Sequence, residues 1–286
     1  MVCTSPYPVY GRMSKSNLYV PCGHCTACRI QRTSQWALRL MNELPYWNNE
    51  ASFITLTYDD EHLPEYGTLV KDDLQKFWKR LRKDIDFPIR YYACGEYGDE
   101  RMRPHYHAIV FGLPYDKHSR QLMKDNWTLC DPTRFDYDYI KHKEQGFAPV
   151  SPDDIRYVCG YVQKKYNGKL AEEVYGKNRI SPFSVCSRGL GLRFAEDNKK
   201  ELENGDITFR GHPVSVPRYY INKLGIKTNS NFGFQHKVDY LADNGIDIRD
   251  IPPSQVTKFV NEKYESLAES HLQQYERELR ARYSME

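Results

Sequence analysis

Apolar residues recur along the chain in patterns that predict both helices and strands. Helical spacing of apolar positions indicates helices at residues 29–44, 71–83, 152–165 and 254–282. Short runs rich in β-branched and aromatic residues indicate strands at residues 52–58, 89–96, 105–112 and 146–150. This order of elements predicts an α+β fold, with helices packed on one face of a central antiparallel sheet.

The same pattern divides the chain into three expected parts. Residues 1–45 form a Cys-rich N-terminal segment with the first helix, and residues 46–170 hold the sheet and its helices. Residues 171–286 form a C-terminal extension that ends in a long, charged helix. We find no internal repeat and no low-complexity tract.

Composition narrows the classes of protein that fit. Of 286 residues, 40% are hydrophobic and 14% aromatic, and the net charge is +3, so we expect a folded chain whose nucleic-acid surface, if any, is local. No apolar run approaches about 18 residues, and the N-terminus lacks the apolar core of a signal peptide. We therefore expect no membrane association and a cytoplasmic location with reduced thiols. A G-x-x-x-x-G-K-[ST] nucleotide loop is also missing.

Two histidines and a carboxylate form the first candidate site. His105 and His107 are two residues apart on a predicted strand, so they point to the same face. A hairpin would bring Glu96, at the end of the preceding strand, across from them. Two imidazoles and a carboxylate suit a catalytic divalent ion, Mg²⁺ or Mn²⁺, that also contacts substrate oxygens. The alternative is that these are ordinary, half-exposed strand histidines.

Two tyrosines form the second candidate site. Ser151 as N-cap and Pro152 in the first turn begin a helix on which Tyr157 and Tyr161 are neighbours, one turn apart. Lys164 or Lys165 continues that face and could stabilise charge on a phosphate or a phenolate. Tyrosines at this spacing also pack together without any catalytic role.

Closely spaced cysteines form a third candidate site. Cys22, Cys25 and Cys28 follow a C-x₂-C-x₂-C pattern, with His24 between them and Cys3 upstream. Three thiolates with Cys3 or His24 could bind a structural Zn²⁺, although reduced thiols without a metal fit the pattern equally well.

Three segments, in this order, resemble the motifs of the HUH endonuclease superfamily of relaxases and rolling-circle initiators. FITLTYDD (53–60) resembles its first motif, RPHYHAIVFG (103–112) its His-hydrophobic-His motif, and YVCGYVQKK (157–165) its two-tyrosine motif. The segments PCGHCTACR (21–29), GEYG (95–98) and PRYY (217–220) are similar to those of the replication initiators of gokushovirus-type microviruses. The similarity spans roughly residues 20–225.

The resemblance implies an RRM-like HUH core and a rolling-circle replication initiator. One tyrosine would nick single-stranded DNA at the phage origin and keep its 5′ phosphate, and the 3′-OH would prime synthesis. Carried over by position, His105, His107 and Glu96 are the metal ligands and Tyr157 and Tyr161 the nucleophiles, assisted by Lys164 or Lys165. A host helicase and polymerase are the implied partners, in the cytoplasm of a bacterial host.

Three other functions remain open on the sequence alone. A transposase or relaxase of a mobile element would use the same chemistry. A non-enzymatic, zinc-containing nucleic-acid-binding protein would not need His105 or His107. A metal-dependent phosphodiesterase that uses water would form no covalent adduct. The origin sequence and the oligomeric state are not encoded in any of these motifs.

Overall fold

The computed structural model describes most of the chain. The described residues are 7–9, 18–98, 101–136, 146–164, 168–209 and 212–226, with parts of 238–274; among these, the side chains of 7–9, 18–20, 161–164, 168–170, 206, 209, 212 and 213 are not described. Contacts divide the chain into two compact units, residues 33–194 and residues 1–32 with 195–286, and each is described by itself.

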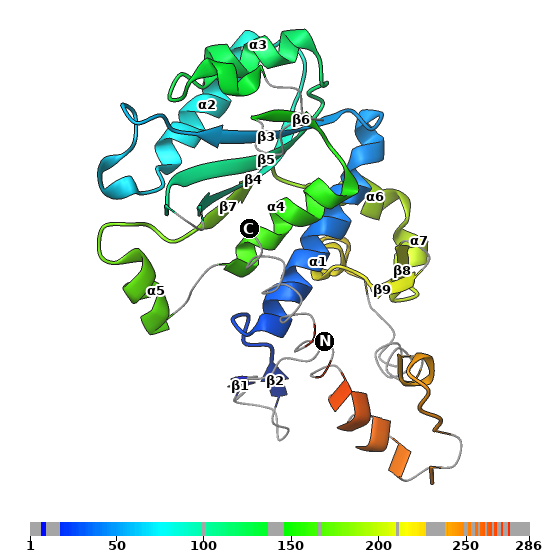
Figure 1. The fold of residues 1–286 in the computed structure, drawn as a ribbon. Coiled ribbons are helices and arrows are strands. Elements are labelled where there is room, and N and C mark those ends of the chain that lie inside the picture. The colour runs from blue at the N-terminus through cyan, green and yellow to red at the C-terminus, as the bar shows by residue number, and fades with distance from the viewer. Residues whose placement is uncertain are drawn as a thin grey trace. The chain divides into compact units, whose positions relative to one another are not determined.

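A five-stranded antiparallel sheet forms the centre of the first unit (Figure 1). Its strands, in spatial order, are β6 (Phe147–Pro149), β3 (Ala51–Thr57), β5 (Pro104–Phe111), β4 (Arg90–Tyr97) and β7 (Phe183–Cys186). The helices of this unit are α1 (Thr26–Glu43), which begins in the other unit, α2 (Lys71–Asp84), α3 (Lys117–Asn126), α4 (Pro152–Lys164) and α5 (Gly168–Tyr175). Short 3₁₀ turns are η1 (Leu44–Trp47), η2 (Glu65–Gly67) and η3 (Pro132–Phe135).

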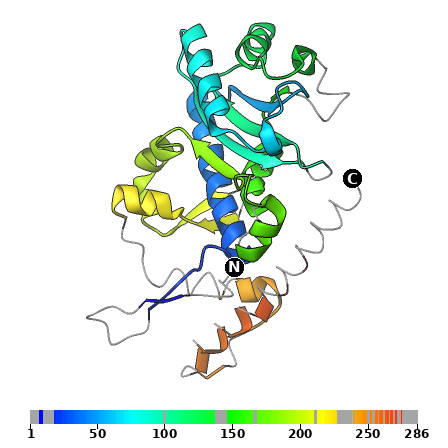
Figure 2. The same ribbon diagram turned by 90° about the vertical axis from the view of Figure 1, so that its left-hand side faces the viewer.

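Helices cover both faces of this sheet, with α2 and α3 on one side and α1 and α4 on the other (Figure 1). Figure 2 shows the long helix α1 running past the strands. On α2, four residues at helical spacing are fully or almost fully buried: Leu74, Phe77, Trp78 and Leu81. The opposite face buries Leu40 of α1 and Ile155 and Val158 of α4. The predicted α+β class with an antiparallel sheet is confirmed, but the expectation of helices on one face only was wrong, because the central strands are apolar on both faces.

Local sequence signals explain where elements begin and end. Ser151 and Asp154 form a reciprocal cap at the start of α4, with Asp154 N 3.2 Å from Ser151 Oγ and Ser151 N 2.7 Å from Asp154 Oδ2. Gly112 ends β5 at φ +79°, and a Cβ there would lie 2.7 Å from Pro88 O and from the Trp47 ring. Only glycine fits this turn.

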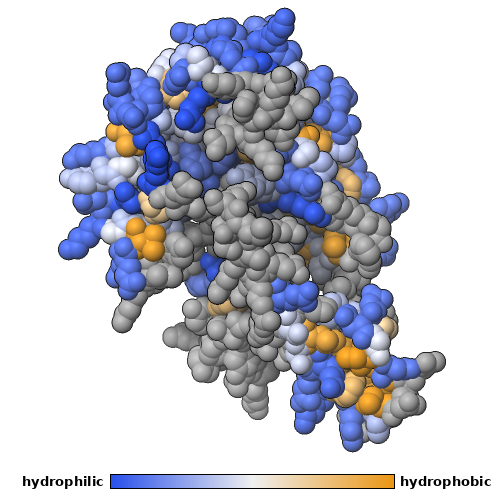
Figure 3. Space-filling model, viewed as in Figure 1, coloured by the Kyte–Doolittle hydropathy of each residue, from blue (hydrophilic) through white to orange (hydrophobic). Residues whose placement is uncertain are grey.

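The second unit contains small elements and a C-terminal hydrophobic cluster. The paired strands are β1 (Tyr7–Val9) with β2 (Leu18–Val20) and β8 (Asp206–Phe209) with β9 (His212–Ser215), and the helices are α7 (Lys199–Leu202) and α8 (Arg218–Leu224). Helix α6 (Leu192–Asp197) spans the boundary between the units. Leu241, Val260 and Tyr264 are buried together, and hydrophobic residues gather on this part of the surface (Figure 3).

The predicted elements and the observed ones agree closely in the first unit. The strands and helices expected between residues 29 and 165 are all present within a few residues of their predicted ends. Helix α3 and strand β7 were not predicted, and β7 takes the sheet beyond residue 170, where the core was expected to end. The described residues between 255 and 274 are helical, as predicted for residues 254–282; the remaining residues of that segment lie outside the described part. Among the described residues, no helix is both long and apolar enough to cross a membrane.

Candidate active site

The pairing of β4 with β5 brings the predicted metal ligands together. In this antiparallel register Glu96 lies opposite His105, and Cys94 lies opposite His107. Side chains two residues apart share a face of a strand, so Glu96, His105 and His107 all project from the face that carries α1 and α4. The expected hairpin is therefore confirmed, and Tyr106 between the histidines points into the opposite core.

The three side chains meet at the carboxylate. Glu96 Oε1 lies 2.7 Å from His105 Nε2 and 3.5 Å from His107 Nε2. One donor atom from each residue lies within 4.8 Å of the other two. Glu96 and His107 are only 5% and 6% exposed, whereas His105 is partly exposed. This is a compact set of ligands that is open to solvent through His105.

The electrostatics of Glu96 favour a bound cation. Burial raises the pKa of the Glu96 carboxyl, but hydrogen bonds from His105 and His107 outweigh burial and hold that pKa below its ordinary value. The carboxylate is thus ionised at neutral pH. Its second oxygen, Oε2, is buried, and no group among the described residues donates a hydrogen bond to it. A buried carboxylate oxygen without a donor fits a metal ligand.

The far side of each imidazole is also held. His105 Nδ1 lies 3.2 Å from the Arg103 carbonyl oxygen, which can only accept, so this nitrogen carries a proton. In the neutral ring the lone pair of His105 is then on Nε2, toward Glu96. His107 Nδ1 lies 2.9 Å from Thr55 Oγ1, and its ring stacks on Phe53 with 5.5 Å between centroids. Both rings are oriented as metal-binding histidines usually are.

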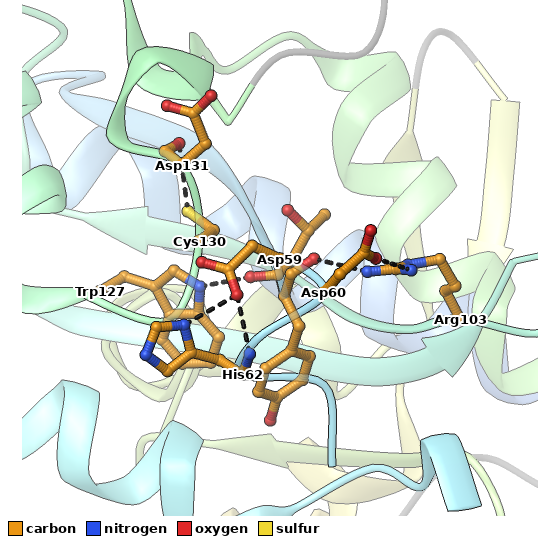
Figure 4. Close-up of polar contacts among 9 residues, drawn as sticks. Asp59, Asp60, His62, Arg103, Trp127, Cys130 and Asp131 are labelled. Atoms are coloured by element: carbon orange, nitrogen blue, oxygen red, sulfur yellow. Dashed lines mark hydrogen bonds and ion pairs between the residues drawn. The ribbon is translucent and has the colours of Figure 1, made fainter.

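The loops at this end of the sheet are tied to the same strands (Figure 4). Arg103, two residues before His105, donates to Tyr58 O at 3.0 Å and pairs with Asp60 at 2.6 Å. Trp127 Nε1 donates to the carbonyl oxygen of Thr57 at 2.6 Å. These contacts fix the chain that follows β3 against the start of β5, next to the candidate ligands.

Helix α4 places Tyr157 against this cluster. Ile155, Val158 and Cys159 are fully buried on the sheet, as their spacing predicted. Tyr157 lies on the neighbouring side of the helix and is 45% exposed. Its ring meets the His107 ring edge-on, with 5.5 Å between centroids, and lies 6.3 Å from Phe53. An accessible tyrosine ring thus contacts a candidate metal ligand.

The other predicted residues are described less fully. Tyr161 and Lys164 lie on α4, one and about two helical turns beyond Tyr157, and their side chains are outside the described part; Lys165 is outside it entirely. Cys22, Cys25 and Cys28 are brought together, with their sulfur atoms within 4.8 Å of one another, whereas Cys3 is outside the described residues.

Two residues of the site were not identified from the sequence. Thr55 and Phe53 contact His107 from β3, and both belong to the predicted strand at residues 52–58. Their positions alternate along that strand, which would have placed them on one face. The missing information was that β3 pairs with β5.

Comparison with known proteins supports the resemblance seen in the motifs. Residues 51–166 match a family model of replication-associated proteins of the ORF2 type. The chain is 30% identical over 219 residues to replication-associated protein ORF2 of Spiroplasma virus 4, covering 71% of this chain and 65% of the relative. It is 31% identical over 211 residues to replication-associated protein VP4 of Bdellovibrio phage phiMH2K, covering 70% and 65%.

A third relative, replication-associated protein ORF4 of Chlamydia phage 1, is 29% identical over 228 residues, covering 75% of this chain and 56% of the relative. The matched part of the chain thus spans slightly less than two thirds of the curated relatives. No solved structure matches it significantly. The family match covers the strands and the helix that carry Glu96, His105, His107 and Tyr157, and the chain is accordingly placed among the phage replication-associated proteins of the ORF2 type.

Proposed function

We propose that this protein initiates rolling-circle replication as a metal-dependent, site-specific endonuclease and strand transferase acting on single-stranded DNA. The observation that carries this proposal is the contact between Tyr157 on α4 and His107 in the Glu96–His105–His107 cluster. A nucleophile and a cation site lie side by side, as an attack on a phosphodiester requires. The relatives named as replication-associated proteins support the role in replication.

The chemistry needs both halves of this site. A phenol ordinarily has a pKa of about 10 and is a weak nucleophile at neutral pH. Mg²⁺ or Mn²⁺ bound by Glu96, His105 and His107 would polarise the scissile phosphate and stabilise its developing charge. The phenolic oxygen of Tyr157 attacks phosphorus, the bond from phosphorus to the 3′ oxygen breaks, and the phenolic proton is lost as the 3′-OH gains one. The resulting 5′-phosphotyrosine can be attacked by a 3′-OH, which reseals the strand without ATP.

A second tyrosine extends this scheme. Tyr161, one helical turn along α4, would cleave or capture the second DNA end, and Lys164 or Lys165 would stabilise charge near the phosphate. The DNA partner is the origin in its single-stranded form. Unwinding and synthesis would fall to a host helicase and polymerase in the bacterial cytoplasm.

A covalent-adduct assay tests the proposal. Purified protein is mixed with Mn²⁺ and labelled single-stranded oligonucleotides that tile the source genome, and products are separated under denaturing conditions. We expect an adduct from a small subset of oligonucleotides, its loss in EDTA, and its loss in the Tyr157→Phe/Tyr161→Phe double variant. Mapping the attached nucleotide would define the cleavage site.

Matched controls separate this chemistry from simple binding. Tyr66→Phe changes an exposed tyrosine on η2 and should leave adduct formation unchanged. Oligonucleotide binding without any adduct, unaffected by His105→Ala/His107→Ala, would instead indicate a non-enzymatic DNA-binding protein. Adducts that persist in the double tyrosine variant would refute the assignment of the nucleophiles.

A further inference from the structure

A second set of potential metal ligands lies at the start of α1, in the other unit of the chain. The sulfur atoms of Cys22, Cys25 and Cys28 all lie within 4.8 Å of one another, and no disulfide joins these three residues to each other. In tetrahedral zinc–thiolate sites a Zn–S bond of about 2.3 Å places the sulfurs about 3.8 Å apart. The three sulfurs therefore need only small shifts to share one ion.

The backbone between the first two cysteines is shaped to face a thiolate. The amide nitrogens of His24 and Cys25 lie 3.4 and 3.3 Å from Cys22 Sγ and donate to it. Gly23 adopts φ +76° in this turn, although nothing lies within 4 Å of the position that a Cβ would take. The glycine is thus required by the shape of the turn rather than by crowding. Amide donors around a thiolate are the outer-shell contacts that support a metal ligand.

The helix contributes as well. Arg29 N donates to Cys25 O at 3.0 Å, so Cys25 precedes the first turn of α1, and Cys28 lies within that turn. The N-terminal end of a helix carries partial positive charge, which favours thiolates placed there. Cys22 and Cys28 are only 9% and 7% exposed. These thiols are close together, largely buried and electrostatically set for a cation.

The surroundings offer little else to hold this segment. Among the described residues, the hydrophobic cluster here consists of Ala27 and Ile30, with Cys25 partly buried against them. A cluster this small contributes little stability, and small modules often use a structural metal for this purpose.

We propose that Cys22, Cys25 and Cys28 bind one zinc ion as thiolates, and that this ion anchors the chain before α1 to the first turn of the helix. The fourth ligand comes from outside the three described cysteines. Soft thiolates select zinc, whereas a carboxylate with two imidazoles also accepts Mg²⁺ or Mn²⁺. The protein therefore holds two metal sites of different chemistry, one structural and one catalytic.

Metal analysis of the full-length protein tests this site. The measurement uses the His105→Ala/His107→Ala background, so that zinc at the catalytic cluster does not count. After equilibration with excess Mg²⁺ and gel filtration under reducing conditions, we expect one zinc per chain by mass spectrometry. Adding Cys25→Ser or Cys28→Ser should remove it, whereas Cys130→Ser, a buried cysteine on the sheet unit, should retain it.

Cobalt substitution provides a second readout if the serine variants fold poorly. Co²⁺ exchanged into the parent protein should show the thiolate charge-transfer absorption and the intense d–d bands of a tetrahedral site. The proposal is overturned if the parent protein retains no zinc and gives no thiolate–Co²⁺ absorption. It is equally overturned if its thiols react with a thiol reagent at the same rate with and without added Zn²⁺.

Discussion

Thr55 Oγ1 and His107 Nδ1 lie 2.9 Å apart across the β3–β5 pair. When His107 Nε2 binds a metal, Nδ1 carries the proton and donates it to Thr55, which fixes both the tautomer and the ring orientation. Thr55→Val removes the hydroxyl but keeps a β-branched side chain on the strand. We expect the affinity for Mn²⁺ to fall by about 10–100-fold, as for other outer-shell contacts, measured by isothermal titration calorimetry.

Thr57→Val is the matched control for this change. Thr57 lies on the same strand and face, opposite His105, and its hydroxyl has no hydrogen-bond partner among the described residues. Its variant should bind Mn²⁺ within about twofold of the wild type. Equal losses in the two variants would mean that the Thr55 hydroxyl has no specific role in orienting His107.

Metal binding should also stabilise the sheet unit. A ligand that binds only the folded state adds about 2.7 kcal/mol to the free energy of unfolding at one hundred times its dissociation constant. Saturating Mn²⁺ should therefore raise the melting temperature of the wild type, followed by circular dichroism, and EDTA should reverse the rise. Glu96→Ala should lose this response, because it removes the ionised, buried ligand. His62→Ala, at an exposed histidine paired with Asp59, should keep it.

The sequence predicted the local part of this site, and tertiary pairing determined the rest. Glu96 and His105 come from adjacent strands joined by a short hairpin, so strand periodicity and chain proximity were sufficient to place them together. Thr55 was missed because β3 pairs with β5 across the intervening β4 and α2 in the sequence, and no local pattern encodes that neighbour. Helices on both faces were missed for a related reason: residues such as Phe53 and Ile54 are buried on opposite sides of one strand.

A buried carboxylate near the other end of β4 should matter for stability rather than for chemistry. Glu43 is fully buried; its Oε1 accepts from Arg90 at 2.7 Å and Trp47 at 2.9 Å, and its Oε2 accepts from Gly191 N at 2.6 Å. Glu43→Ala leaves Arg90 without its partner, which costs about 3–5 kcal/mol in such pairs. Urea denaturation should show this loss in the free energy of unfolding.

The control for this change is Glu61→Ala, at an exposed carboxylate in the loop after β3. It should alter the free energy of unfolding by no more than about 0.5 kcal/mol. If Glu43→Ala were equally mild, the buried interactions of Glu43 would not be a net source of stability.

Tyr106 shows that the residue between the two histidines has a structural role of its own. It is fully buried on the α2 side, and its hydroxyl accepts from Val70 N at 2.8 Å and donates to Val70 O at 2.9 Å. Tyr106→Phe keeps the ring but leaves both backbone groups of Val70, at the start of α2, without this partner. We expect a loss of about 1–3 kcal/mol in the free energy of unfolding, measured by urea denaturation. Mn²⁺ affinity should stay within about twofold of the wild type, because His105 and His107 keep their side of β5. A large loss of Mn²⁺ affinity with unchanged stability would contradict this division of roles between the two faces of the strand.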